Sequence, residues 1–151
     1  MYPMSSSVAY DLYAPYDNDD YCSYTRYIDG DVKFKDLKPG DKMYFCNEYE
    51  IKEMIVDKPL YETKGHLYIK YHFEGKKAIR TINFGPTYDA DVMNAYENNV
   101  VDYTIDHEDG IIATSRETVK SETIKIYEDK IQNLEIEIED LQSYIRGVEE
   151  L

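Results

Sequence analysis

The chain has 151 residues, with 31 acidic and 17 basic side chains and a formal net charge of −14. This length allows one modest domain with appended segments, of which roughly 80 to 90 residues are enough for a small β-barrel core. Free nucleic acid and anionic membranes are poor partners for so acidic a chain, whereas a basic protein surface is a good one.

The targeting and redox signals are those of an intracellular protein. No apolar run reaches membrane-spanning length, and the N-terminus lacks the basic and apolar regions of a signal peptide. Cys22 and Cys46 are the only cysteines and form no metal-binding or disulfide framework. We therefore expect a soluble, cytoplasmic protein with free thiols, with a single disulfide left open.

Residues 1–30 form an acidic, tyrosine-rich segment, which we interpret as an N-terminal arm. Tyr10, Tyr13 and Tyr16 are spaced by three, which places them on one side of an extended or 3₁₀-like segment. Tyrosine is enriched at interface hot spots, so an arm that combines it with aspartate suits a basic, partly apolar partner. The alternative is an arm that wraps around its own barrel and fills grooves there.

Residues 31–112 have the pattern of a small antiparallel β-domain. Runs of β-branched and aromatic residues between Gly-containing turns predict strands at residues 43–46, 50–56, 67–73, 78–84 and 100–105. Within one run, Leu67, Ile69, Tyr71 and Phe73 share a face. The Glu74-Gly75 turn predicts a hairpin with the next strand, and the short turn spacing favours a meander that closes into a barrel.

The start of this domain carries a resemblance to a known architecture. The residues from Leu37 to Lys42, Leu-Lys-Pro-Gly-Asp-Lys, lead into the apolar run Met43-Tyr44-Phe45. A Gly-Asp turn followed by such a strand resembles the entry of an SH3-like small barrel, over about residues 31–112. The resemblance implies a fold and a tendency to bind peptides or nucleic acids, and it transfers no site residue.

Basic residues in the same domain leave a nucleic-acid-binding face open as a further alternative. Lysines on exposed strand positions more often serve solubility, so direct nucleic-acid binding is the less favoured interpretation. The residues concerned lie near Tyr68 and Tyr71 and are Lys52, Lys58, Lys70, Lys76, Lys77 and Arg80.

The acidic charge is concentrated after this basic stretch, since residues 87–112 contain no Lys or Arg. We take the acids of this segment as candidate partner-binding residues, together with the three tyrosines of the arm. They are Asp89, Asp91, Glu97, Asp102, Asp106, Glu108 and Asp109.

No motif indicates catalysis, a cofactor or a metal. The run Asp106-His107-Glu108-Asp109-Gly110 contains metal-ligand residue types, but consecutive residues at a hairpin tip point in different directions. A polar β-turn explains the run better. We therefore expect a non-catalytic protein.

Residues 113–151 form the clearest pattern in the chain, a helix with an unbroken 3-4 apolar repeat. Thr114 followed by Glu117 has the spacing of a capping box. β-Branched residues at position a with mostly leucine at d favour two parallel strands. Position a is occupied by Ile124, Ile131, Ile138 and Ile145, and position d by Tyr127, Leu134, Leu141 and Val148.

This seam predicts a parallel homodimer, in which Lys130 of one copy faces Glu135 of the other. The strict 3.5-residue period argues against a helix that lies flat on its own domain, where a broader face of 3.6-residue period is usual. Packing on its own domain remains the first alternative, and a helix for a foreign partner is the second. Ile126 and Ile136 lie off the seam and are available for another contact.

Together these patterns predict an α+β fold: an SH3-like antiparallel β-barrel followed by a long coiled-coil helix. In size, charge and architecture the chain resembles small acidic inhibitors encoded by phages, including anti-CRISPR proteins and DNA mimics. This implies a protein that docks on the basic, nucleic-acid-binding surface of a partner, such as a nucleic-acid enzyme, and blocks it. The alternatives are an assembly protein that uses the coiled coil and the arm, and a regulatory barrel that binds nucleic acid.

Overall fold

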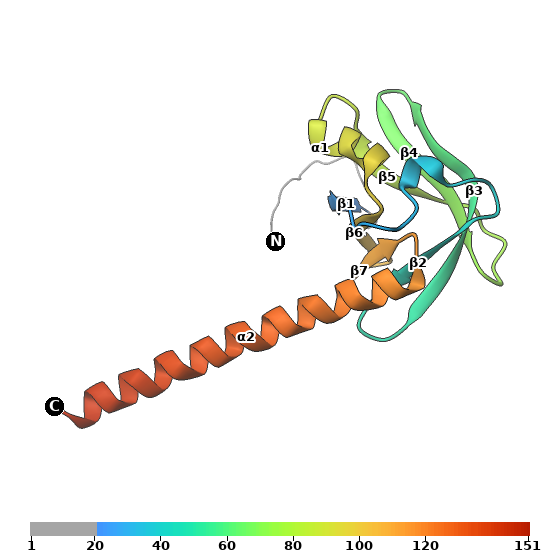
Figure 1. The fold of residues 1–151 in the computed structure, drawn as a ribbon. Coiled ribbons are helices and arrows are strands. Elements are labelled where there is room, and N and C mark those ends of the chain that lie inside the picture. The colour runs from blue at the N-terminus through green and yellow to red at the C-terminus, as the bar shows by residue number, and fades with distance from the viewer. Residues whose placement is uncertain (1–20) are drawn as a thin grey trace.

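The structure is a computed structural model that describes residues 21–151. In this range the chain forms one antiparallel sheet, which curls into a half-barrel, and a long C-terminal helix that projects from it (Figure 1). The strand order is β1-β6-β7-β2-β3-β4-β5. The elements are β1 (Tyr21–Arg26), η1 (Phe34–Asp36), β2 (Lys42–Cys46), β3 (Ile51–Thr63), β4 (His66–Phe73), β5 (Arg80–Pro86), α1 (Ala90–Met93), η2 (Asn94–Glu97), β6 (Val100–Ile105), β7 (Glu108–Ala113) and α2 (Arg116–Glu149). The expected α+β combination is confirmed.

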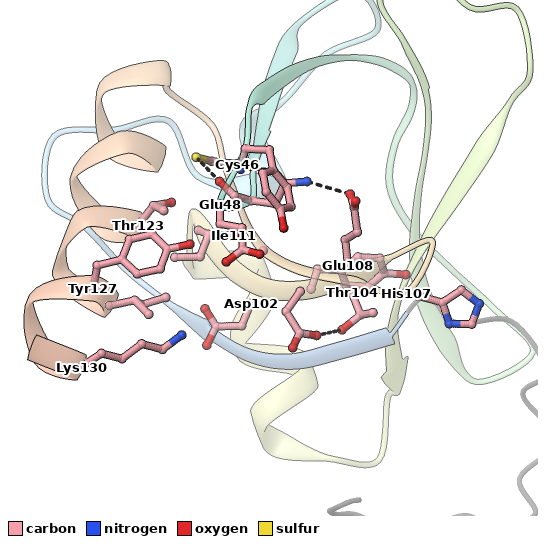
Figure 2. A pocket seen from close by; sticks show the side chains of 16 residues that line it. Cys46, Glu48, Asp102, Thr104, His107, Glu108, Ile111, Thr123, Tyr127 and Lys130 are labelled. Atoms are coloured by element: carbon pink, nitrogen blue, oxygen red, sulfur yellow. Dashed lines mark hydrogen bonds between the residues drawn. The ribbon is translucent and has the colours of Figure 1, made fainter. Parts of the chain in front are cut away.

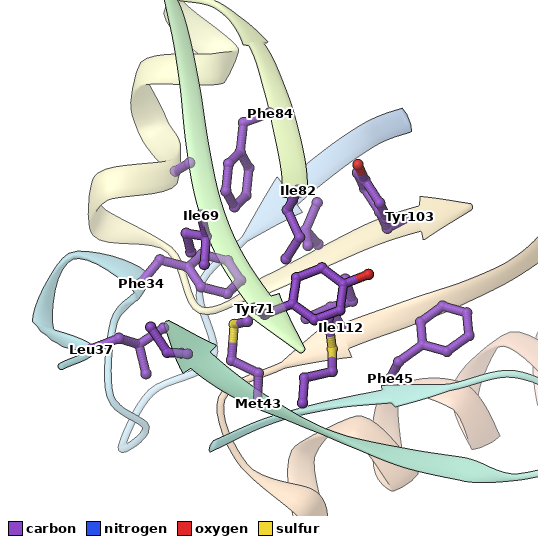
Figure 3. Close-up of a cluster of buried hydrophobic side chains, with 14 of the residues drawn as sticks. Phe34, Leu37, Met43, Phe45, Ile69, Tyr71, Ile82, Phe84, Tyr103 and Ile112 are labelled. Carbon is purple, nitrogen blue, oxygen red and sulfur yellow. The ribbon is translucent and has the colours of Figure 1, made fainter. Parts of the chain in front are cut away.

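The main core fills the concave side of the curled sheet (Figure 3). Alternation along β4 places Leu67, Ile69 and Tyr71 on this side, which confirms the shared face predicted from the sequence, and all three are fully buried. Phe34 of η1 closes one end of the core, with its ring 5.4 Å from that of Phe84. Burial of Tyr71 removes it from any nucleic-acid-binding face.

Several strand bounds differ from the sequence prediction. The strands expected at 43–46, 67–73 and 100–105 are found within one residue, whereas β3 extends to Thr63 and β5 begins at Arg80. Two strands, β1 and β7, were not predicted. The first of these, at residues 21–26, pairs with β6 and is an edge strand of the sheet, although it lies inside the expected N-terminal arm.

The turn before β7 is shorter than the polar run suggested. Asp106 and His107 both have positive φ, 52° and 68°, which is the backbone geometry of a two-residue hairpin turn. Gly110 therefore belongs to a strand, and its role is close packing. A Cβ atom there would lie 2.5 Å from Cε1 of Phe45 and 2.6 Å from the carbonyl oxygen of Cys46.

The first turns of α2 cover the convex side of β2 and β7. Val119 is fully buried there beside Cys46, Val100, Ile111 and Ala113. The helix cap is Ser115, whose hydroxyl accepts a hydrogen bond from the backbone N–H of Thr118 at 3.1 Å, so the assignment of the cap to Thr114 was wrong by one residue. At 34 residues α2 is about 50 Å long, and most of it extends beyond the sheet (Figure 1).

Among the helices of residues 21–151, none combines the length and apolar character needed to cross a membrane.

Candidate functional site

The orientation of α2 is set by a group of polar contacts where the helix meets the sheet. Arg26, at the end of β1, donates hydrogen bonds to Asp102 of β6 at 2.9 Å and to Glu122 of α2 at 2.8 Å. Thr118 donates to the carboxylate of Asp31, and Lys125 donates to Glu122 at 2.9 Å. These contacts tie three elements to one another and fix the angle at which the helix leaves the domain.

Glu122 is the most buried acid of this group, with 6% of its side chain exposed. Burial disfavours its charged form, but hydrogen bonds from Lys125 and Arg26 outweigh that effect. The pKa of the Glu122 carboxyl is therefore lowered from its ordinary value. The carboxylate stays charged and holds the guanidinium of Arg26 in place.

Beside this network a pocket of about 720 Å³ opens between residues 123–130 of α2, the β2–β3 turn and the β6–β7 hairpin (Figure 2). Its apolar lining includes Ile111, Ile126 and Tyr127. Four carboxylates also line it, against the single ammonium group of Lys130. They are Glu48, Asp102, Glu108 and Asp109. We call this cavity the acidic pocket.

Besides Asp102, which accepts from Arg26, two more of these carboxylates are held in position by neighbouring side chains. Asn47 donates to Glu108 at 2.7 Å, and Thr104 donates to Asp109 at 2.7 Å. A carboxylate has about four acceptor positions, so one such bond leaves it able to accept from a ligand cation. Lys130 extends from the helix in the direction of Asp102 (Figure 2).

The acidic pocket also affects the one phenol that α2 contributes to it. Burial, with Glu48 nearby, raises the pKa of Tyr127. Tyr127 is half-buried, so the first d residue of the seam is shared with the pocket. The combination of carboxylates above an apolar lining fits a lysine or arginine side chain, whose aliphatic stem needs apolar contact and whose head needs acceptors.

The structure does not bring all seven predicted acids together. Asp102, Glu108 and Asp109 line the acidic pocket, whereas Asp89 and Asp91 lie at the start of α1, away from α2 (Figure 1). Asp89 caps α1 by accepting from the backbone N–H of Asp91 at 2.9 Å. Asp89 therefore has a structural role at a different end of the molecule.

Two further predicted acids are paired with basic side chains. Glu97 accepts from Lys33 at 2.8 Å and from Lys35 at 2.7 Å, and these hydrogen bonds lower its pKa to about 2. Asp106 accepts two hydrogen bonds from Arg80, which lower its pKa although burial opposes the shift. The charges of these two acids are thus neutralised locally. Glu48, which the sequence analysis did not select, joins the site from the β2–β3 turn.

Tyr10, Tyr13 and Tyr16 lie outside the described residues. Within residues 21–151, no group of three or more His, Cys, Asp or Glu side chains is arranged to hold a metal ion. Cys46 is a free, buried thiol that donates to the carbonyl oxygen of Asn47 at 3.4 Å.

The helix seam is exposed along the projecting part of α2. Seven of its eight residues have 53% to 67% of their surface exposed: Ile124, Ile131, Leu134, Ile138, Leu141, Ile145 and Val148. At 100° per residue, Ile124 and Ile131 lie about 120° to 140° around the helix from the buried Val119. The domain therefore leaves the seam uncovered, and the alternative in which the seam packs on its own domain is not found.

Comparison with known protein families, characterised proteins and solved structures finds none that matches this chain.

Proposed function

We propose that this chain is a non-catalytic, dimeric binding protein that docks on a basic surface of another protein and blocks it. The observation that carries the proposal is the acidic pocket, where carboxylates from three elements converge above apolar side chains. A lysine or arginine from the partner would enter this pocket. Docking of this kind on a nucleic-acid-binding surface would inhibit the partner by occupying its site.

Dimerisation through the seam is part of the proposal. A stripe of exposed isoleucine and leucine about four heptads long is apolar surface that a second copy would cover. The coiled coil would present two acidic pockets, and their joint binding would raise the apparent affinity through effective concentration. We also propose that the half-barrel is SH3-like and that the protein is located in the cytoplasm.

A defined probe tests the pocket before any partner is known. We expect a fluorescein-labelled decalysine peptide to bind the chain at low salt, and the double variant Glu108→Gln/Asp109→Asn to weaken binding at least about tenfold, since charge-assisted hydrogen bonds are lost. The matched control is Glu62→Gln/Glu74→Gln, which makes the same change in net charge at exposed positions away from the pocket. Equal losses in both variants would show that only net charge matters and would contradict the proposal.

The inhibitory role is tested by capture from a host lysate at low and at high salt, read by mass spectrometry. Recovery of a nucleic-acid enzyme at low salt only, lost with the pocket variant, would support the proposal and identify the target.

An assembly role is the second candidate, and the projecting seam favours it. A helix about 50 Å long that touches its own domain only near its start is suited to join subunits of a larger complex. This role predicts salt-tolerant capture of structural proteins that is insensitive to the pocket variant.

A further inference from the structure

The strand register places basic and aromatic side chains in one row on the outer face of β3 and β4. Lys58 lies opposite Lys70, and Tyr61 lies opposite Tyr68. Because Leu67, Ile69 and Tyr71 point into the core, Tyr68 and Lys70 point to the other side of the sheet. We call Lys58, Tyr61, His66, Tyr68 and Lys70 the β3–β4 strip.

The aromatic members of the strip form one continuous platform. The ring centroids of Tyr61 and Tyr68 are 5.6 Å apart, and the ring of His66 stacks on Tyr68 with a centroid distance of 6.1 Å. Each of the three residues is partly exposed. Cross-strand aromatic pairs stabilise a hairpin by themselves, so the rings alone do not indicate a ligand.

The two lysines of the strip do indicate a ligand. Like charges directly opposite each other destabilise a sheet, and within the described residues neither Lys58 nor Lys70 forms a salt bridge. Several other lysines in residues 21–151 also lack a salt bridge, so the distinguishing feature of Lys58 and Lys70 is that they lie directly opposite each other. The ammonium nitrogen of Lys58 lies 4.1 Å from the ring centroid of Tyr61, so positive charge and stacking surface are adjacent.

Asp57, the acid next to Lys58 in β3, already has a partner. Asp57 accepts from Nδ1 of His72 at 2.9 Å, and it therefore has a partner on β4 other than Lys70. A chain with 31 acids places none of them in a salt bridge with this lysine pair, within residues 21–151. The strip is thus a locally cationic surface on an acidic protein.

We propose that the β3–β4 strip binds single-stranded nucleic acid, with phosphates on Lys58 and Lys70 and bases stacked on the three rings. Sequence-tolerant binding of single strands uses this combination of cations along the backbone and aromatic platforms for the bases. A duplex hides its base faces, and an acidic peptide would use the lysines but has no need of the rings. The proposal goes beyond the docking function and uses a different face from the acidic pocket.

The negative charge of the whole chain sets the conditions under which binding is seen. At 0.1 M salt the Debye length is about 10 Å, so acids farther away are largely screened while the two lysines act at contact distance. Two phosphate contacts predict a slope of about −1.4 for log K against log salt concentration on a single strand.

The test is fluorescence anisotropy of a labelled 15-residue oligothymidylate with the full chain in 0.1 M salt. We expect binding, a loss of at least about tenfold in Lys58→Ala/Lys70→Ala, and a loss of roughly 5- to 150-fold in Tyr68→Ala. Tyr68→Phe should retain binding, because it keeps the stacking ring. Lys38→Ala/Lys120→Ala is the matched control, since it removes the same charge from exposed positions outside β3 and β4.

Three outcomes would overturn the proposal. They are no anisotropy change up to about 100 µM protein, equal losses in both lysine variants, and displacement of the oligonucleotide by an equally charged oligoglutamate at the same concentration. Far-ultraviolet circular dichroism of each variant tests whether the fold is intact. If Tyr68→Ala is unfolded, the Tyr68→Phe variant and the two lysine variants decide the question.

Discussion

At the scale of single residues, Glu122 is the side chain whose charge contributes most directly to the shape of the molecule. It is the buried end of an ion network that reaches β1 and β6 through Arg26. Replacement by glutamine keeps the volume but removes the charge of one carboxylate that the guanidinium contacts. We expect Glu122→Gln to lower the free energy of unfolding by about 1–3 kcal/mol at pH 7, measured by urea denaturation.

The loss of unfolding free energy caused by Glu122→Gln is expected to depend on pH. The folded pKa of Glu122 is below its ordinary value of 4.5, so its contribution is fully present above that value and is lost as the pH falls through the folded pKa. The difference between parent and variant should therefore shrink from pH 7 to pH 3. Glu139→Gln, at an exposed position of α2, should change stability by less than about 0.5 kcal/mol. A difference that stays constant with pH would show that the charge of Glu122 is not involved.

At the scale of elements, local patterns predicted β4 and the helix but missed β7 and β1. Ile111, Ile112 and Ala113 point alternately to the two faces of the sheet, and all three are buried. Because both faces are covered here, β7 shows no alternation of polar and apolar residues. Its first three residues, Glu108-Asp109-Gly110, have the composition of a turn, and they form a strand because they pair with residues 103–105 of β6. In β1, the regular spacing of tyrosines masked the strand pattern.

The function of the seam can be tested with a closely matched control on the same helix. Ile138 lies on the seam and Ile136 lies off it, with 54% and 51% of their surfaces exposed, respectively. We expect Ile138→Asp to raise the dimer dissociation constant at least about 100-fold, because each copy loses a buried apolar side chain and places a charge in the interface. Ile136→Asp should leave the dimer intact. Sedimentation equilibrium measures both, and a parent chain that is monomeric, or equal effects of both variants, would exclude the seam as a dimer interface.

At the scale of the whole molecule, the sequence showed the acidic excess but not its distribution. Glu97 is paired with Lys33 and Lys35, more than 60 residues away, and Asp106 is paired with Arg80. No local pattern predicts such pairs, because they depend on which strands become neighbours. The same holds for Glu48, which becomes part of the acidic pocket only because the β2–β3 turn lies beside α2 and the β6–β7 hairpin.

The direction of the coiled coil decides whether the two acidic pockets can act on one partner. In a parallel dimer both domains lie at the same end, whereas an antiparallel arrangement separates them by about the 50 Å length of α2. Position d of one helix faces position d of its partner only in the parallel arrangement. We therefore expect Leu141→Cys to form an intermolecular disulfide on mild oxidation.

The parent chain, which carries Cys22 and Cys46, is the control for crosslinks that these cysteines make themselves. A disulfide is compatible with Cα atoms about 4.4–6.8 Å apart, so crosslinking at residue 141 requires the two helices to be in register there. Non-reducing electrophoresis of Leu141→Cys should show a dimer band that is absent from the parent. If sedimentation shows a dimer but no such band appears, the coiled coil is antiparallel or shifted. The two pockets would then face separate partners. Their joint binding would no longer raise the affinity, because effective concentration is lost when geometry prevents joint binding.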